Sequence, residues 1–372
     1  MKNNTIRQNI EDKSIIWFQD NNEYLVVEPL VAETLSLLNK KISKKEIVSQ
    51  ITKQVNIPSQ QAIDLVADIE TLLVSSEEKN NKKLPPVTKP KTFEVVKYYS
   101  INNLYFKVSY ASDAEAFLIH PKFTHLEIKN TTSIDHQFEV YSNDNAISFS
   151  VDDILIDTWN LNEVHFFQGK FSMELVQKIH QKNEDEWIGT FHASAVSDGD
   201  NVILFLGDSG NGKSTSLALL QANGFTCLAD DFVPVDNSLN VHSFPSAISI
   251  KKNSLETLLP IYPELKTSAE YHFKKLNKIV RYLPTNNKNY SLKLPCKALV
   301  FIKYQKNSDL IINKISNITA FEQLVPDSWL SPLPENAKLF LNWFEKLPFY
   351  QLTYSDNEKM ISTVKKIFAD DL

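Results

Sequence analysis

The chain has 372 residues, of which 42% are hydrophobic and 23% charged, a balance typical of a folded protein with room for two or three domains. Its net charge of -6, with acidic and basic residues mixed along the sequence, argues against nucleic acid as the main partner, because phosphate binding needs clustered Lys and Arg. The polar start lacks the apolar core of a signal peptide and no apolar run reaches membrane-spanning length, so we expect no membrane partner and a cytoplasmic protein.

The first 76 residues predict a small α+β domain with a winged-helix-like arrangement. Two short strands, SIIWF and EYLVV, flank an Asp-Asn-Asn turn. Pro29 begins a helix, and Ser43 and Glu46 form a capping box for a second helix, where the hydroxyl and the carboxylate each satisfy a free backbone N–H group. A third helix begins near Pro58 and carries apolar residues at helical spacing.

Residues 77–92 predict an extended linker, because charged residues, Asn and three prolines replace the hydrophobic periodicity there. From residue 93 to about residue 170 the sequence predicts successive strands separated by turns rich in Asn, Asp and Ser. Residues 171–372 then alternate apolar strands with helices, as in NVILFLG, CKALVFIKY and the closing helix NEKMISTVKKIF. We therefore expect one α/β domain over 93–372, with a strand-rich part at 93–170 and a core at 171–372.

All seven glycines of the chain lie between Gly169 and Gly224, and three of them belong to one motif. The segment GDSGNGKS, which begins at Gly207, fits G-x-x-x-x-G-K-[ST], the phosphate-binding loop of nucleotide-binding proteins. An apolar strand precedes it and a helical run ending at Gly224 follows it, the context in which backbone N–H groups turn around phosphates at a helix N-terminus. A tight turn without a ligand is the alternative. The predicted nucleotide site consists of Gly207, Asp208, Ser209, Gly210, Asn211, Gly212, Lys213, Ser214 and Thr215.

Several polar residues in and around this motif suit phosphate chemistry. Lys213 is expected to reach the β- and γ-phosphates, and the Ser214 hydroxyl to bind Mg²⁺. Sixteen residues later an apolar strand ends in Asp230 and Asp231, a carboxylate pair that can hold Mg²⁺ or accept a proton; a solvated turn with two acids is the alternative. His192 lies on the strand before the loop strand and comes near the loop if the two are neighbours; the alternative is a structural histidine.

Four segments of this region, FHASAV, GDSGNGKST, LLQANGF and LADDFVPVD, resemble the catalytic domain of HPr serine kinase/phosphorylase and its relatives. The resemblance implies a P-loop domain with a fold akin to phosphoenolpyruvate carboxykinase, which uses ATP and Mg²⁺ to phosphorylate a serine hydroxyl. By position, it implies that Asp230 is the base that receives the serine proton and that His192 assists it. It implies that Asp231 contributes to metal binding or charge balance.

Two departures from that family change the expected substrate. The family usually has Glu after the loop serine, where this chain has Thr215, and its Gly-rich signature after the acidic pair is absent, since no glycine follows Gly224. The stretch HSFPSAISIKKN stands there instead. It looks more like divergent HPr-kinase-like enzymes found with ribosomal peptide clusters, which phosphorylate a precursor peptide.

A phosphoryl transition state also needs cations from outside the loop, because it spreads negative charge over its equatorial oxygens. Arg281, the one arginine after the linker, is a candidate for this catalytic role, and Lys251 is a similar one. The alternative for both residues is a surface cation.

The N-terminal segment VEPLVAETLSLLNKKISKKEIVSQITKQVNIPSQQAIDLVADIETLL resembles the PqqD-like leader-recognition domains of ribosomal peptide biosynthesis. Such domains hold a precursor peptide as an added strand against a sheet edge and the third helix. A generic three-helix adaptor or a DNA reader is the alternative, and the lack of a basic recognition helix counts against DNA.

Together, the two resemblances imply an ATP-dependent kinase that phosphorylates a Ser or Thr hydroxyl of a ribosomally made precursor peptide, recruited through its leader by residues 1–76. Two alternatives stay open, namely a kinase of a free small-molecule hydroxyl and a nucleotide-gated peptide-binding module without transfer chemistry. The acidic pair beside His192 favours chemistry, because nucleotide sensing alone needs no base. HPr kinases assemble as hexamers, so the sequence also leaves a homo-oligomer open.

Overall fold

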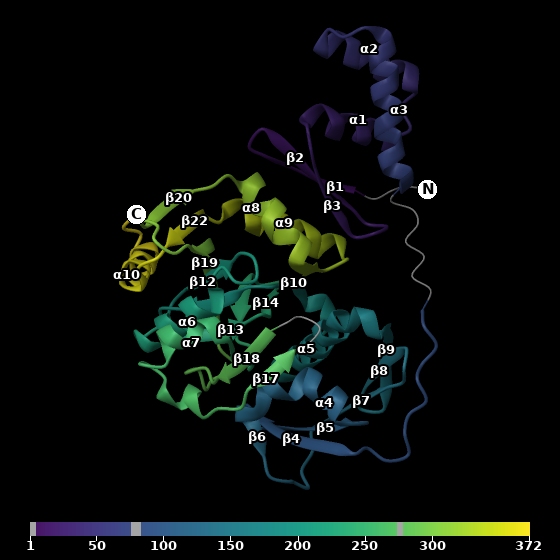
Figure 1. Ribbon diagram of the computed structural model, residues 1–372. Helices are drawn as coiled ribbons and strands as arrows, with labels where there is room; N and C mark the ends of the chain where they lie inside the picture. The colour runs from purple at the N-terminus through teal and green to yellow at the C-terminus, as the bar shows by residue number, and fades with distance from the viewer. Residues whose placement is uncertain (1–4, 76–82, 274–277) are drawn as a thin grey trace. The chain divides into compact units, whose positions relative to one another are not determined.

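The protein is a mixed α/β protein with several sheets, which confirms the predicted α/β class (Figure 1). The computed structural model describes residues 5–75, 83–273 and 278–372, and within these ranges it contains ten α-helices. None of the described helices is both long and apolar enough to cross a membrane. The chain forms two compact units, the first from Met1–Asn81 and Ile315–Lys346, the second from Lys82–Lys314 and Leu347–Leu372.

The first unit starts with an antiparallel sheet of order β1-β2-β3, followed by three helices. The strands β2 and β3 are the two that the sequence predicts, whereas β1 lies in the polar N-terminal stretch, where no strand was expected. The elements are β1 (Thr5–Ile10), β2 (Lys13–Phe18), β3 (Glu23–Val27), α1 (Pro29–Asn39), α2 (Lys44–Val55) and α3 (Ser59–Ser75).

The helices of this unit begin where the sequence predicts. Pro29 lies in the first turn of α1, where a backbone N–H group would have no partner within the helix. The Ser43 hydroxyl accepts a hydrogen bond from the Glu46 N–H group at 3.3 Å and so caps α2. The helices α1 and α3 then pack on one face of the sheet through a core of Ile16, Phe18, Ala32, Leu35 and Ile69.

A segment distant in sequence covers the other face of this sheet. Trp17 points to that face, because side chains alternate along β2 and Phe18 packs on α1. Its cross-strand neighbour Tyr24 packs edge-on against Phe321 and Phe340, at ring-centroid distances of 5.9 and 5.7 Å. These rings come from residues 315–346, which the sequence analysis had assigned to the domain 93–372. This segment contains α8 (Asn317–Leu324), β21 (Ser328–Leu330) and α9 (Pro334–Lys346).

The second unit begins with the end of the predicted linker, whose residues 77–82 lie outside the described residues. Val87 donates its backbone N–H to the Ser148 hydroxyl at 3.0 Å. Lys89 pairs with the buried Glu139 at 2.5 Å. The described part of the linker is therefore held against the neighbouring sheet.

That sheet has six strands in the order β6-β4-β5-β7-β8-β9 and corresponds to the predicted strand-rich part. Its core is aromatic, because Phe167 and Phe171 of the helix α5 pack against Phe149, at 5.8 and 5.3 Å between ring centroids. The elements are β4 (Val95–Ile101), β5 (Leu104–Tyr110), α4 (Asp113–Ile119), β6 (Glu127–Ile128), β7 (His136–Ser142), β8 (Ala146–Val151), β9 (Ile154–Asn160) and α5 (Val164–His180).

The core of the second unit is a mixed sheet in which β13, β11, β12 and β19 are neighbours in that order, with β22 beside β19. The strands β12, β19 and β22 run parallel, so their C-terminal ends lie at one edge of the sheet, where ligands bind in α/β proteins. The helix α6 follows β12 at that edge (Figure 1). The elements are β11 (Ser194–Ser197), β12 (Val202–Leu206), α6 (Lys213–Ala222), β13 (Thr226–Asp230), β19 (Lys293–Tyr304), β20 (Ile311–Lys314), β22 (Phe349–Tyr354) and α10 (Asn357–Phe368).

Two further groups of strands complete this unit. The strand β19 also pairs with β15, and from there the sheet continues through β14 to β10. A separate sheet has the order β16-β18-β17. The strand on which the sequence placed His192 is in fact two strands, β10 and β11, separated by a bend at His192. The elements are β10 (Trp187–Phe191), β14 (Val233–Asp236), β15 (Asn240–His242), β16 (Ile248–Lys251), α7 (Leu255–Leu258), β17 (Tyr271–Phe273) and β18 (Lys278–Leu283).

Candidate functional site

The predicted phosphate-binding loop connects β12 to α6, as the motif requires. Gly207, Gly210 and Gly212 have φ values of 129°, 106° and 96°, a region that side chains other than glycine rarely adopt. A Cβ atom on Gly207 would lie 2.9 Å from the carbonyl oxygen of Ile302, and one on Gly212 would lie 3.2 Å from the Tyr354 hydroxyl. The ends of β19 and β22 therefore leave room only for glycine at these two positions.

The Lys213 side chain is turned into the loop. Its ammonium group donates a hydrogen bond to the carbonyl oxygen of Gly207 and lies 3.5 Å from that of Asp208. The side chain is largely buried, at 7% exposure, so its charge lies inside the loop rather than in bulk solvent. A cation held there can bind the phosphates of a nucleotide.

Asp230 lies at the end of β13, directly behind the loop serine. Its carboxylate accepts hydrogen bonds from the Ser194 hydroxyl at 2.6 Å, the Ser214 hydroxyl at 2.9 Å and the backbone N–H of Ser249 at 3.0 Å. Its side chain is buried, with only 1% of the residue exposed. Burial raises the pKa of Asp230 to about 6, the neighbouring charge of Asp231 adds to the rise, and the three hydrogen bonds oppose it.

Asp231 follows the strand and has a different environment. Its φ of 65° turns the chain, and its side chain keeps 30% exposure and lies 4.0 Å from the Lys122 ammonium group. Burial opposes its ionisation, but the positive charges of Lys122, Lys213 and Lys251 outweigh that effect and lower the pKa of Asp231. Asp231 is therefore an ionised carboxylate that solvent can reach.

A cavity of about 730 Å³ opens over the loop, a volume suited to a ligand of nucleotide size. Ten residues that the sequence singled out line this cavity: Asp208, Ser209, Gly210, Gly212, Lys213, Ser214, Thr215, His192, Asp231 and Lys251. The others named there, Gly207, Asn211, Asp230 and Arg281, do not line it. His192 reaches the cavity because β11 is paired with β12, which brings the bend before β11 to the edge of the sheet that carries the loop.

Two further lysines line the cavity without having been predicted. Lys122 belongs to the strand-rich part and reaches Asp231. Lys278 lies on β18, where Val280 and Tyr282 also face the cavity. The predicted cation Arg281 lies between the latter two, so the alternation of the strand turns it away.

Arg281 has a structural environment on the far side of β18. Its guanidinium group donates hydrogen bonds to the carbonyl oxygens of Leu265, at 2.9 Å, and Ser268, and pairs with Glu270 at 3.1 Å. The geometry thus does not support the role that the sequence analysis proposed for Arg281. Lys278, Val280 and Tyr282 occupy alternate positions of β18 and so face the same side. This alternation in the sequence was the signal that would have identified Lys278 as a cation of the cavity.

The Ser214 hydroxyl fits a ligand of a magnesium ion. It lines the cavity and is an oxygen donor, which Mg²⁺ prefers, and Asp230, which lies outside the cavity lining, orients it through a hydrogen bond of 2.9 Å. Within the described residues, no three His, Cys, Asp or Glu side chains cluster so that they could hold a metal by themselves. Mg²⁺ in nucleotide sites takes only one or two protein ligands and completes its shell with phosphate and water, so the set here is sufficient.

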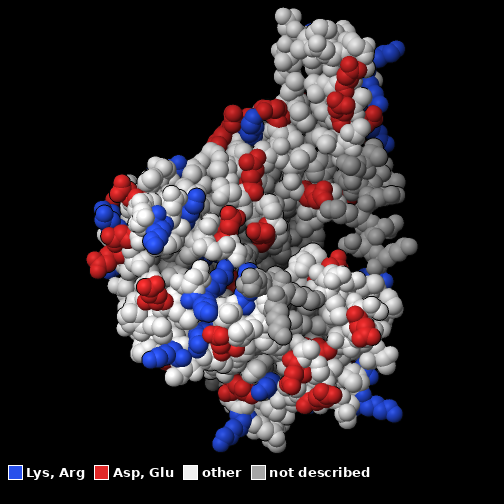
Figure 2. Space-filling view, viewed as in Figure 1, with Lys and Arg blue, Asp and Glu red and all other residues white. Residues whose placement is uncertain are grey.

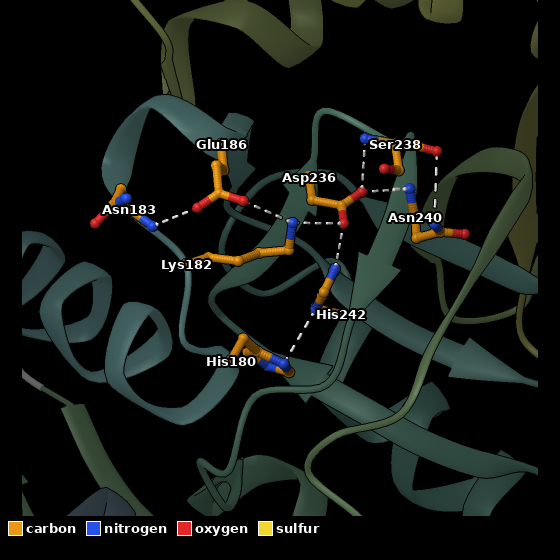
Figure 3. A network of polar contacts seen from close by, with 8 residues as sticks. All are labelled: His180, Lys182, Asn183, Glu186, Asp236, Ser238, Asn240 and His242. Carbon is orange, nitrogen blue, oxygen red and sulfur yellow. Dashed lines mark hydrogen bonds and ion pairs between the residues drawn. The ribbon is translucent and has the colours of Figure 1, made fainter.

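A second polar cluster lies at the end of β14 (Figure 3). Asp236, which is fully buried, accepts hydrogen bonds from His242 at 2.8 Å and from the backbone N–H groups of Ser238 and Asn240, both at 3.0 Å. Lys182 lies 3.3 Å from the same carboxylate. None of these residues lines the cavity over the loop.

On the face of the molecule drawn in Figure 2, Lys and Arg side chains are interspersed with Asp and Glu. This face gives no support to a nucleic-acid partner, which would require a continuous basic area.

No protein-family model matches the chain, and a search of curated proteins found no match. The function is therefore inferred from the motif and from the geometry of the cavity.

Proposed function

We propose that the protein is an ATP-dependent kinase of the HPr-kinase-like type, with a P-loop domain akin to that of phosphoenolpyruvate carboxykinase, and that it phosphorylates a Ser or Thr hydroxyl of a precursor peptide. The observation that carries the proposal is the position of the Asp231 carboxylate, which lines the same cavity as the phosphate loop. A nucleotide-binding protein without chemistry has no need of such a group.

The two acids have distinct roles in this proposal. The family resemblance implied that Asp230 is the base and that Asp231 contributes to metal binding or charge balance; we propose instead that Asp231 is the base and that Asp230 orients the loop serine. Asp230 is buried and accepts hydrogen bonds from Ser214 and two other donors, so it suits the orientation of the loop serine. Asp231 lines the cavity, where an acceptor hydroxyl can approach it. By its position it is therefore the carboxylate that can receive the hydroxyl proton, with His192 beside the same cavity.

The chemical step can then be written with these residues. The acceptor hydroxyl oxygen forms a bond to the γ-phosphorus while the bond from that phosphorus to the β,γ-bridging oxygen breaks, and the hydroxyl proton passes to Asp231. Lys213 and Lys251 offset the charge that spreads over the phosphoryl oxygens. Mg²⁺, which Ser214 would bind while Asp230 orients that hydroxyl, would supply further neutralisation of the phosphates.

The first unit is the proposed peptide-recognition domain of the PqqD-like, winged-helix-like type. A three-stranded sheet followed by three helices supports this assignment, and β3 is an edge strand in the order β1-β2-β3. An edge strand offers unpaired backbone groups to an extended peptide, which can pair with it as an additional strand. Linking a leader-binding domain to a kinase raises the effective concentration of the acceptor hydroxyl.

The test is incubation of the full chain with ATP, Mg²⁺ and the product of a small open reading frame next to its gene, followed by mass spectrometry. We expect the peptide to gain the mass of a phosphoryl group on a Ser or Thr residue. Lys213→Ala should abolish the gain, because the cation of the loop is lost. Lys252→Ala, which changes an exposed lysine outside the cavity lining, is the matched control and should retain it.

Other outcomes of this experiment separate the alternatives. Phosphorylation of a free hydroxyl metabolite in place of the peptide would replace the peptide substrate with a small molecule. Nucleotide binding without transfer to any hydroxyl would overturn the assignment as a kinase. Full transfer by Lys213→Ala would remove the phosphate loop from the mechanism.

A further inference from the structure

The cavity over the phosphate loop has a second, apolar wall that the proposed chemistry does not use. This wall comes from the strand-rich part of the second unit and from β17, and it consists of Phe117, Leu118, Leu161, Val164 and Phe273. All five residues keep part of their surface exposed, so they are available to a ligand rather than being closed into the core. We call this set the apolar wall.

The apolar wall is built as a fixed surface. Phe117 and Phe273 lie 5.0 Å apart between ring centroids, the range of favourable aromatic pairs. The Gln168 amide of α5 donates a hydrogen bond to the carbonyl oxygen of Leu118 at 2.8 Å, which ties α5 to α4 at the cavity. A surface held in this way can select a side chain by shape.

A line of aromatic rings connects the apolar wall with the acids. Tyr282, on the cavity side of β18, lies 5.4 Å from Tyr271 between ring centroids, and Tyr271 lies 6.1 Å from Phe117. Burial raises the pKa of Tyr282 and the negative charge of Asp231 adds to the rise, so Tyr282 lies within electrostatic reach of that carboxylate. The wall therefore begins near the group that would accept the proton.

The position of Lys122 also places the apolar wall on the side of the cavity where Asp231 lies. This lysine lies 4.0 Å from Asp231 and follows Leu118 by only four residues, so the part of the wall formed by α4 is on the side of Asp231. Thr215, which follows the loop serine, instead bonds through its hydroxyl to Ser254 at 2.8 Å. In-line transfer requires the acceptor and the leaving group on opposite sides of the γ-phosphorus. The acceptor then approaches from the side of Asp231, and the rest of the nucleotide extends toward Thr215.

We propose that the apolar wall is the acceptor pocket of the kinase, and that it takes an aromatic or large aliphatic side chain adjacent in sequence to the phosphorylated Ser or Thr. This inference rests on the proposed kinase function. Burial of such a side chain at the wall positions the neighbouring hydroxyl between the γ-phosphorus and Asp231, where its proton and its new bond to phosphorus follow the step described above. A small or acidic neighbour would leave the wall unfilled.

The test uses a set of synthetic Ser peptides that differ only in the residue next to the serine, with Phe, Leu, Ala or Asp at that position. Phosphorylation by the full chain is measured as kcat/KM with ATP and Mg²⁺. We expect Phe and Leu peptides to exceed the Asp peptide by about ten- to a hundred-fold, the discrimination that an apolar pocket provides. Phe117→Ala should remove most of this preference, and Phe117→Leu should restore much of it.

Phe166→Ala is the matched control, because Phe166 is an aromatic residue of α5 that is 57% exposed and does not line the cavity. It should keep the wild-type preference. Nucleotide affinity, measured in parallel by titration with ATP, should be unchanged in Phe117→Ala. A loss of nucleotide affinity in that variant would overturn the proposal and assign the wall to the nucleotide base.

The outcomes also separate this inference from the kinase assignment. Equal rates for all four peptides, with efficient transfer, would overturn the acceptor pocket and leave the kinase in place. No transfer to any of these peptides or to the open-reading-frame product, with ATP bound, would overturn both.

Discussion

Asp230 and Asp236 end two consecutive strands, β13 and β14, and both are buried, but their surroundings differ in charge. Asp236 faces the ammonium group of Lys182 and the ring of His242, in addition to backbone N–H groups. Burial opposes its ionisation, but its hydrogen bonds from His242 and Asn240 and the nearby positive charge lower the pKa of Asp236 to about 2. Asp230 has only neutral donors and a second acid beside it, and its pKa is raised.

The difference shows that residue type and burial do not by themselves identify a functional acid. A carboxylate paired with a cation in a closed environment is stabilised in one charge state and has no route to a ligand. In a carboxylate that has only neutral donors and a neighbouring acid, the charged form is disfavoured. A metal ion bound nearby can stabilise that charged form, so such a carboxylate is typical of a functional site. We therefore regard the Asp236 cluster as structural and the Asp230–Asp231 pair as functional, and three experiments test this distinction.

The largest expected effect is that of Asp231→Asn on catalysis. This change removes the proposed base but keeps the side-chain shape, and Asn tolerates the positive φ of 65° at this position. We expect kcat for phosphoryl transfer to fall by about 10²- to 10⁴-fold, the usual worth of a general base. Initial rates with saturating peptide measure the loss, and ATP titration checks that the nucleotide still binds. Transfer near the wild-type rate would return the role of base to Asp230.

The next effect is that of Asp236→Asn on stability. The change leaves Lys182 without its buried counter-charge and weakens the hydrogen bond from His242, so we expect the free energy of unfolding to fall by about 3–5 kcal/mol. Denaturant titration of the full chain measures it, and Asp200→Asn, at an exposed turn, is the control. Below its unfolding temperature the variant should bind ATP as the wild type does. A loss of ATP affinity without a loss of stability would contradict the structural role of this cluster.

The smallest effect is a pH-dependent gain in stability in Asp230→Asn. Because the folded-state pKa of Asp230 is raised to about 6, its contribution to stability is fully present below the unfolded pKa and is lost as pH rises through the folded value. Asn does not titrate, so the stability of the variant relative to wild type should increase by about 1–3 kcal/mol between about pH 4.5 and pH 7.5. Thermal unfolding at a series of pH values measures the difference.

The direction in which stability changes with pH distinguishes Asp236 from Asp230 in the same measurements. Asp236, with its lowered pKa, contributes stability above the unfolded value near about 4 that is lost as pH falls toward about 2. Asp236→Asn should therefore differ most from wild type at neutral pH and least in strong acid. If the free energies of unfolding of Asp230→Asn and the wild type differed by the same amount at every pH, Asp230 would not be held in an unfavourable charge state.

The sequence predicted the phosphate loop because every determinant of that loop is local. Gly207 and Gly212 occur at the spacing of the motif, and the flanking strand and helix follow from short-range patterns. The helix starts at Pro29 and Ser43 were predicted for the same reason, since a proline or a cap acts on its own turn.

The remaining features depend on long-range pairing and could not be read from local patterns. The side of β18 on which Arg281 lies is set by the register in which that strand pairs with β16. A shift of this register by one residue would turn Arg281 toward the cavity and its neighbours away from it. The hydrogen bonds that distinguish Asp230 from Asp231 come from Ser194 and Ser249, which are distant in sequence. The association of residues 315–346 with the first unit depends likewise on contacts of Phe321 and Phe340 with Tyr24.

That association limits how the molecule can be divided or recombined. The chain leaves one unit for the other after Asn81, again after Lys314 and again after Lys346. A fragment cut at the linker would keep the sheet but lose the aromatic rings that cover Trp17 and Tyr24, and so would expose an apolar face prone to aggregation. An exchange of the first unit between related proteins would therefore have to transplant two separate pieces of the gene together.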